Sequence, residues 1–289
     1  MRIPVRRLVK HLSVGSSDKI LQQIPTPSRV IWDVNDHIAA HKAIRASGGF
    51  NYEICRIPVP TSIRYDRLRL ALGDDISPKE RKVLELIEFG FPLSADSAFG
   101  VRRPQKNHQS ALTFASHVEA YLNKGVESKA ILGPFEVAPI SDLCYSPLMT
   151  VPKEVLSRRV IVDFSFPAGR AINDGIPRDA YLDCEVEFCL PSVKSMIARV
   201  NSLGKGCMLF KRDLKSAFRQ FHIDPGDYRF SGLCWKDIIY IDTRLAMGLR
   251  SASFCCQSVT EMVAKVANDK AFILVYLDDF GGGRAPKHG

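Results

Sequence analysis

Two adjacent aspartates at the end of an apolar run constrain this fold more than any other feature of the sequence. The segment AFILVYLDDFGGG spans residues 271–283, and its first part shows no alternation of apolar and polar side chains. Such a run is typical of a strand that is covered on both faces and lies centrally in a sheet. Asp278 and Asp279 repel each other and resist burial without a counter-charge, and the glycines allow a tight turn. We therefore predict that a divalent metal binds there through oxygen ligands, although a capped and solvated loop would also tolerate two aspartates.

Asp213 is a third carboxylate that ends an apolar run, here the letters CMLFKRD. The run predicts a buried strand, and the residues after it predict a short helix. Taken alone, Asp213 is better explained as a helix N-cap or as the partner of Lys211 or Arg212. If its strand neighbours the strand that ends at Asp278 and Asp279, the three carboxylates converge on two metal ions, an arrangement that drives in-line phosphoryl transfer.

Strand and helix patterns fill the second half of the chain. SPLMTVPK and RRVIVDFSF predict a hairpin, and LPSVKSMIARVNSLG predicts a helix closed by Gly204. A second hairpin is predicted to turn at Lys236–Asp237, and a long amphipathic helix to follow Ser251. The positions predicted to face inward are Val193, Ile197, Val200 and Leu203 in the first helix, and Ala252, Cys255, Val259, Met262 and Val266 in the second. The order of elements indicates an α/β or α+β sheet with helices packed on it.

The first half of the chain carries weaker signals. Ser77 and Glu80 have the spacing of a capping box, which predicts a helix that ends at Gly90. Residues 91–110 are rich in turn formers, and we interpret them as a linker. A second helix is predicted to end at Gly125, with an apolar stripe formed by Ala111, Ala115, Val118 and Leu122.

Composition narrows the range of partners. The 40 Lys and Arg residues outnumber the 31 Asp and Glu residues, and the net charge of +9 favours polyanions, although a merely basic surface is the simpler alternative. None of the eight cysteines has zinc-site spacing, so we interpret them as reduced core and filler residues of an intracellular protein. No apolar run approaches the roughly 18 residues of a membrane span. The basic stretch before Asp18 is faintly similar to a mitochondrial transit peptide, but an ordinary basic terminus explains it better.

Four motifs in one order resemble a known family. YLDD at residues 276–279 resembles the YxDD signature of reverse transcriptases, and RDLKSAFRQFHI at 212–223 resembles their preceding aspartate motif. LAMGLRSASFCCQ at 245–257 is similar to the motif between these two, and SPLMTVPK with RRVIVDFS is similar to the fingers hairpin. The order and spacing agree along roughly residues 108–280, and eukaryotic retrotransposon polymerases are the most similar in character.

The resemblance implies an α+β palm-and-fingers polymerase fold, in which helices pack on an antiparallel palm sheet. The expected segments are an N-terminal extension or linker with short helices (1–105), fingers (about 106–190 and 222–250) and palm (about 191–221 and 251–289). The chain ends ten residues after Asp279. The resemblance therefore also implies an incomplete palm, without a thumb or an RNase H domain.

The same resemblance implies roles for the carboxylates. Asp213 and Asp278 would bind two Mg²⁺ ions, or Mn²⁺, together with the backbone carbonyl of Leu214, and Asp279 would be a less direct ligand. The metals would activate the primer 3′-hydroxyl and neutralise charge on the departing pyrophosphate. The implied partners are an RNA template, a DNA primer or RNA–DNA hybrid, and dNTPs.

Further residues would contact the incoming dNTP. Phe218 would lie under the sugar and leave no room for a 2′-hydroxyl, although a core position explains it too. Lys153 and Arg159 would reach the triphosphate from the first hairpin, Arg159 through its planar guanidinium, and solvated hairpin charges are the alternative. Gly248 would let the backbone approach the nucleotide, and Met247 would line the pocket.

One turn departs from the family pattern. LAMG has Ala246 where the family commonly has a proline, and Ser253 stands where another proline is common. We therefore expect a looser turn in this chain. Two other functions stay open: a relic that binds nucleic acid without catalysis, and an RNA-dependent RNA polymerase, which Phe218 and Tyr276 disfavour.

Overall fold

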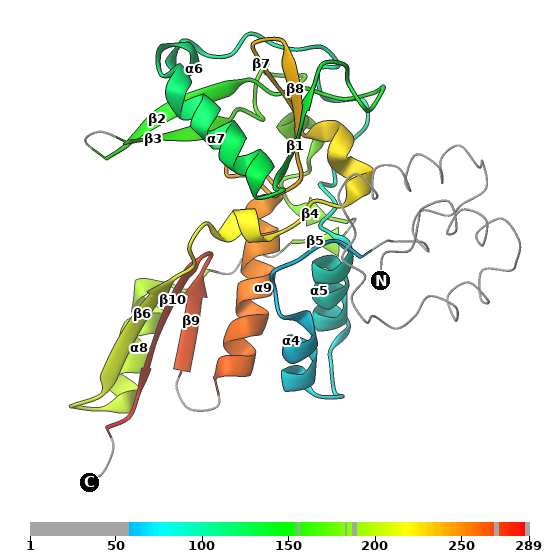
Figure 1. The fold of residues 1–289 in the computed structure, drawn as a ribbon. Coiled ribbons are helices and arrows are strands. Elements are labelled where there is room, and N and C mark those ends of the chain that lie inside the picture. Colours follow the sequence, from blue (N-terminus) through cyan, green and yellow to red (C-terminus); the bar gives the residue numbers. More distant parts are fainter. Residues whose placement is uncertain (1–57, 155–156, 183, 187–189, 269–271, 287–289) are drawn as a thin grey trace, which may run out of the picture.

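The computed structural model describes residues 58–154, 157–182, 184–186, 190–268 and 272–286. Figure 1 shows an upper and a lower region, with helix α9 (Ala252–Ala267) running down from one into the other. The predictions about the basic N-terminus, Cys55 and Cys189 lie outside the described residues. The six cysteines that the structure describes are free, as predicted, and three of them are buried.

The upper region contains a three-stranded antiparallel sheet and a separate hairpin (Figure 1). The sheet has the order β1 (Ile131–Phe135), β8 (Ile238–Asp242), β7 (Gly232–Trp235). The hairpin consists of β2 (Leu148–Glu154) and β3 (Ser157–Val162), as predicted. The β7–β8 turn also lies where predicted, because Lys236 and Asp237 both have a positive φ, the conformation that suits a two-residue hairpin loop.

Two helices pack beside the strands of this region. The single helix predicted after residue 109 is divided at Phe114 into α6 (Gln109–Thr113) and α7 (Ala115–Glu127). The prediction that the helix ends at Gly125 is wrong, because Gly125 lies inside α7. A Cβ atom at Gly125 would come within 2.4 Å of the Ile131 side chain, so the glycine allows α7 to approach β1 closely.

Two helices of the lower region, α4 (Tyr65–Leu72) and α5 (Pro78–Phe89), contact α9. The predicted capping box is confirmed, since the Ser77 amide donates to the Glu80 carboxylate at 2.9 Å and the Glu80 amide donates to the Ser77 hydroxyl at 3.3 Å. The helix ends before Gly90, also as predicted. Helix α9 buries Ala252, Cys255, Val259 and Met262 on the predicted face.

A second sheet lies at the lower left of Figure 1 and corrects the interpretation of residues 271–283. Its antiparallel order is β6 (Met208–Asp213), β10 (Asp279–Arg284), β9 (Phe272–Tyr276). The apolar strand β9 therefore lies at an edge, and the glycines belong to the central strand instead of a turn. A Cβ atom at Gly282 would lie 2.3 Å from the Phe272 carbonyl oxygen and 2.5 Å from the Phe210 ring. Only glycine permits this close packing across the three strands.

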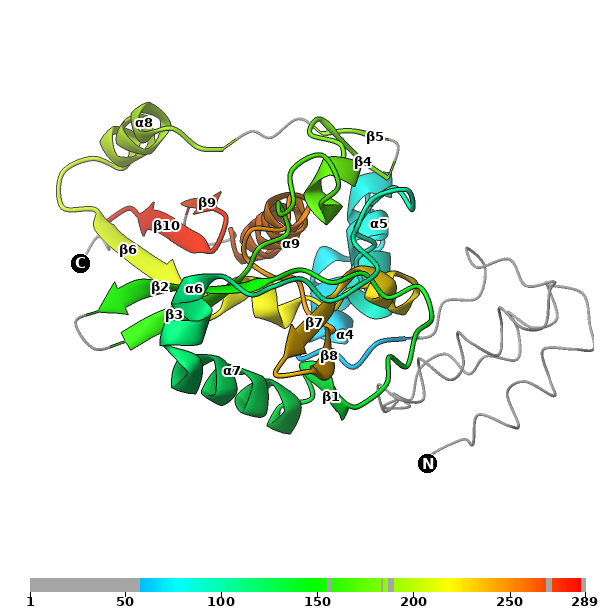
Figure 2. The ribbon, with the colours of Figure 1, turned by 90° about the horizontal axis from the view of Figure 1, so that it is seen from above.

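Two predictions of burial are wrong. All residues of β6 are exposed, whereas the other edge strand, β9, is largely half-buried against α9. Helix α8 (Val193–Leu203) ends before Gly204 as predicted, but Val193 and Ile197 are 76% and 54% exposed. The helix lies against the glycines of β10 through Met196 and Leu203, and Figure 2 shows it at the outside of the molecule, away from α9.

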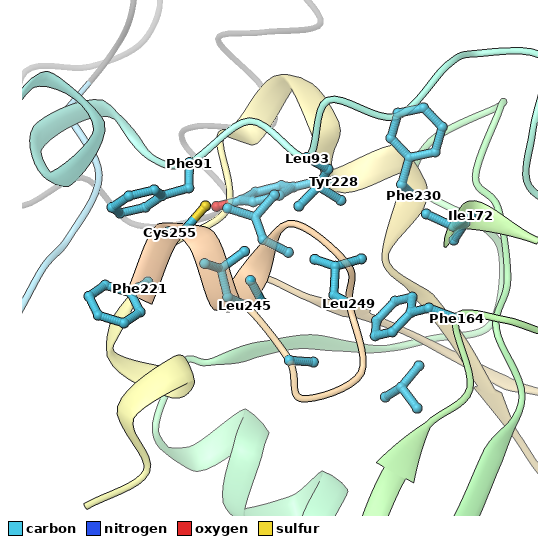
Figure 3. Close-up of a cluster of buried hydrophobic side chains, with 14 of the residues drawn as sticks. Phe91, Leu93, Phe164, Ile172, Phe221, Tyr228, Phe230, Leu245, Leu249 and Cys255 are labelled. Atoms are coloured by element: carbon cyan, nitrogen blue, oxygen red, sulfur yellow. The ribbon is translucent and has the colours of Figure 1, made fainter. Parts of the chain in front are cut away.

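The main hydrophobic core surrounds the start of α9 and includes the segment interpreted as a linker. Phe91 and Leu93 are 1% and 0% exposed, and the Phe91 amide donates to the His222 carbonyl at 2.8 Å. This segment is therefore part of the core. Figure 3 shows these two side chains together with Phe164, Ile172, Phe221, Tyr228, Phe230, Leu245, Leu249 and Cys255. The remaining short elements are β4 (Ala180–Tyr181), β5 (Cys184–Glu185) and 3₁₀ turns at Ile172–Gly175, Ala217–Gln220 and Pro225–Phe230.

Candidate active site

The three predicted aspartates lie where β6 and β9 end and β10 begins. Asp213, the last residue of β6, lies directly opposite Asp279, the first residue of β10. Tyr276 pairs with Asp279 on the other side, so Leu277 and Asp278 form the two-residue turn between β9 and β10. The Leu214 amide donates to the Asp278 carbonyl at 2.9 Å, which fastens the turn to the end of β6. The condition that the two apolar strands β6 and β9 are neighbours is not met, because β10 lies between them; Asp213 instead lies beside Asp279 through the pairing of β6 with β10.

Lys211 lies on the same face of the sheet as Asp213 and Asp279. Side chains two residues apart along a strand project from the same face, so Lys211 shares its face with Asp213 and with the cross-strand neighbour Asp279. The Lys211 ammonium lies 3.1 Å from the Asp279 carboxylate, in an ion pair whose side chains are 72% and 40% exposed. The counter-charge that the sequence seemed to require is thus partly supplied by the protein, and this exposed pair contributes little to stability.

The donor atoms of this site suit Mg²⁺, which prefers carboxylate and carbonyl oxygens. Within the ranges that the structure describes, however, no three His, Cys, Asp or Glu side chains are gathered closely enough to hold a metal. Burial and then the charge of Asp278 raise the pKa of Cys256, on α9, to about 12. A metal bound between Asp213 and Asp279 would have to displace the Lys211 ammonium.

Gln257 holds the turn that carries Asp278, a role that the sequence did not predict. Leu277 has a φ of 54°, a left-handed conformation that costs a β-carbon residue on the order of 1–3 kcal/mol. The Leu277 amide donates to the Gln257 side-chain oxygen at 2.7 Å, and the Gln257 amide group donates to the Val275 carbonyl at 3.2 Å. Gln257 is 5% exposed on an otherwise largely apolar helix face. Periodicity could not have identified it, because Gln257 lies outside the predicted apolar stripe of this helix and precedes another polar residue, Ser258.

We expect Gln257→Met to destabilise the protein by about 1–3 kcal/mol, because methionine has a similar size but leaves two backbone groups without a partner. The Leu277 amide should also exchange its hydrogen faster. Urea unfolding and hydrogen–deuterium exchange measure the two effects, with the exposed Gln109→Met as the matched control. A Gln257→Met protein whose Leu277 amide keeps its wild-type exchange rate would contradict this role.

The predicted nucleotide-binding residues come from three segments. Arg159 on β3 is exposed, and its guanidinium donates to the Met247 sulfur at 3.5 Å, so the hairpin and the turn after β8 lie together. Lys153 on β2 is exposed. Phe218 is half-buried and packs against the main core, as its alternative explanation predicts. Gly248 is exposed and has a φ of 95°.

An ion pair connects the segment that carries Phe218 to the sheet of the upper region. The Arg219 guanidinium donates to the Asp242 carboxylate at 2.5 Å, and the Tyr121 hydroxyl donates to the same oxygen at 3.3 Å. Asp242 is 1% exposed. Burial would lower the pKa of Arg219, but Asp242 and then Tyr121 hold it above its usual value. No sequence pattern predicted this pair.

Comparisons with known proteins find a likeness in structure only. No protein-family model and no curated protein sequence matches the chain. The foamy viral protease–reverse transcriptase in complex with dsDNA is 14% identical, with a TM-score of 0.43, over 78% of this chain and 45% of its own. Native prototype foamy virus protease–reverse transcriptase is 14% identical, with a TM-score of 0.46, over 89% and 30%. The foamy viral protease–reverse transcriptase dRH with dsDNA is 15% identical, with a TM-score of 0.48, over 94% and 42%.

The chain thus spans less than half of the length of each of these three structures. Among the residues that the structure describes, no helix combines the length and the apolar character needed to cross a bilayer.

Proposed function

We propose that this chain is the fingers and part of the palm of a retrotransposon reverse transcriptase, an RNA-directed DNA polymerase. The observation that carries the proposal is the register pair Asp213–Asp279, with Asp278 in the adjoining turn, at the open end of a three-stranded antiparallel sheet. Carboxylates side by side on two neighbouring strands are the kind of oxygen ligands that a two-metal site for in-line phosphoryl transfer uses. The four sequence motifs described above support the same activity.

In the proposed reaction the primer 3′-oxygen attacks the α-phosphorus of a dNTP, and pyrophosphate leaves. Asp213, Asp278 and the Leu214 carbonyl would hold two Mg²⁺ ions, with Asp279 as a less direct ligand. Bound Mg²⁺ would supply Lewis-acid activation of the hydroxyl and neutralise charge on the leaving group.

Other side chains would bind and orient the nucleotide. Arg159 and Lys153 would bind the triphosphate through charge-assisted hydrogen bonds. Phe218 would exclude a 2′-hydroxyl, while Met247 and Gly248 would contact the nucleotide from the turn after β8. An RNA template paired with a DNA primer would be held mainly through its phosphates, which the net charge of +9 favours.

A second candidate function is nucleic-acid binding without catalysis. Two observations favour it: the ion pair of Lys211 with Asp279, and the absence of a gathered metal-binding group among the described residues. A protein of this kind would keep salt-sensitive binding to an RNA–DNA hybrid and would show no metal-dependent extension.

Primer extension by the purified chain on an RNA template tests the proposal. We expect incorporation of dNTPs in preference to rNTPs, dependent on Mg²⁺ or Mn²⁺ and lost in Asp278→Ala, because the site needs its carboxylates to hold the metals. Hybrid binding is measured beside it by fluorescence anisotropy. Binding without extension in the wild-type chain would refute catalysis by this chain and support the second candidate.

A further inference from the structure

Asn173 joins three segments of the chain around the turn that carries Met247 and Gly248. Its side-chain amide donates to the Gly248 carbonyl at 2.8 Å and to the Ser165 hydroxyl at 2.9 Å. Its side-chain oxygen accepts from the Arg250 amide at 2.9 Å. Asn173 is 5% exposed, so these hydrogen bonds are shielded from water and costly to lose.

The backbone of Asn173 is itself fixed. Its amide donates to the Phe164 carbonyl at 3.0 Å, and the neighbouring Ile172 is 1% exposed in the main core. Figure 3 shows Ile172 and Phe164 on the same side of that core as Leu249. Asn173 therefore projects from a rigid support, which is the condition for a side chain that positions another segment.

The turn between Leu245 and Leu249 depends on contacts from outside. Leu245 and Leu249 are 0% and 3% exposed and anchor its two ends (Figure 3). Its middle is different, since Met247 is 46% exposed and a Cβ atom at Gly248 would meet only the Val162 carbonyl, at 3.7 Å. Ala246 is buried in the main core, but packing supports Met247 and Gly248 little, and the polar contacts to Gly248 and Arg250 fix this part of the turn.

We propose that Asn173 is a positioning residue for the nucleotide site. Asn173 fixes this turn in place of the prolines of the family pattern. The inference rests on the proposed function. Its two hydrogen bonds to Gly248 and Arg250 set the turn so that Met247 meets Arg159. The Arg250 guanidinium, which donates to the Ile176 carbonyl, supports the same end of the turn. The looser turn expected from the absent prolines is thereby offset.

Two substitutions of Asn173 separate its hydrogen bonds. Asn173→Leu has a similar volume and removes all of them. Asn173→Asp keeps an oxygen for the Arg250 amide but removes the donor to the Gly248 carbonyl. Ser165→Ala is the matched control, because it removes one partner of Asn173 and leaves both contacts to the turn.

Hydrogen–deuterium exchange of the peptide covering residues 246–250 is the first measurement, since it does not depend on activity. We expect Asn173→Leu to raise the exchange rate of the Arg250 amide about tenfold or more, Asn173→Asp to raise it less, and Ser165→Ala to leave it unchanged. Wild-type exchange in Asn173→Leu, with only a lower unfolding midpoint, would overturn the proposal and leave a merely structural role.

The second measurement is the KM for dNTP in primer extension. We expect it to rise about tenfold in Asn173→Leu with a smaller change in kcat, because the nucleotide binds to a turn that is less often in place. Faster exchange with an unchanged KM would also overturn the proposal. If the wild-type chain neither extends a primer nor binds dNTP, the proposed function fails, and the exchange result alone decides whether Asn173 fixes the turn.

Discussion

Asp213→Asn is expected to lower dNTP incorporation by about a thousandfold or more, which corresponds to roughly 4 kcal/mol of transition-state stabilisation. Asparagine has the same shape but lacks the charge that a metal ligand needs. Asp213 is exposed at the end of β6, so the fold and the unfolding midpoint should change little. Single-turnover extension on an RNA template measures the rate, and anisotropy measures the binding of the hybrid.

The control for this substitution is Asp237→Asn. Asp237 is exposed in the β7–β8 turn with a φ of 62°, a conformation that asparagine also tolerates, and it lies outside the proposed site. It should keep wild-type incorporation. If Asp213→Asn incorporates dNTPs as fast as Asp237→Asn, Asp213 is not a ligand and the proposed chemistry is wrong.

Local patterns predicted several helices and turns of the fold. The capping box at Ser77, the hairpin turn at Lys236–Asp237 and the apolar face of α9 each depend on residues close together in the sequence. The nearness of Asp213 and Asp279 was predicted on the condition that the two apolar strands are neighbours. That condition is not met, because β10 lies between β6 and β9, and the two aspartates come together through the register of β6 with β10.

The order of the strands could not be predicted, because it depends on the glycines of β10, whose lack of side chains lets this strand pack between β6 and β9. Three glycines in a row suggest a turn, since glycine is unfavourable within strands. Here the missing side chains at Gly281 and Gly282 leave space for Met196 and for the Phe210 ring. The apolar composition of β6 likewise suggested burial, but β6 is exposed, whereas β9, the other edge strand, packs against α9.

The polar contacts between residues far apart in the sequence could not be predicted either. Gln257 and Asn173 bond to backbone groups 20 and 75 residues away along the chain. Neither contact has a spacing that periodicity or a capping rule detects. What the sequence offers is the presence of a polar residue among buried neighbours, which indicates that a partner exists without saying where it lies.

Asp242→Asn is expected to destabilise the protein by about 3–5 kcal/mol, because it takes the buried carboxylate away from the largely buried guanidinium of Arg219. The same oxygen accepts the Tyr121 hydroxyl, and the second oxygen accepts the Arg244 amide at 3.0 Å. Burial and then Asp242 raise the pKa of Tyr121, so its hydroxyl stays protonated and can donate to Asp242. Urea unfolding measures the change in the free energy of unfolding.

Two comparisons show whether the loss comes from an unpaired buried charge. Glu119→Gln breaks an exposed ion pair, in which the Lys236 ammonium lies 2.7 Å from the carboxylate, and should change stability far less. The double substitution Arg219→Met with Asp242→Leu removes both charges and should recover much of the stability lost in Asp242→Asn. A double variant less stable than Asp242→Asn would contradict the electrostatic explanation.

Because Arg219 follows Phe218 directly, Asp242→Asn should also weaken discrimination between dNTPs and rNTPs. A loss of stability elsewhere in the molecule would not change this discrimination.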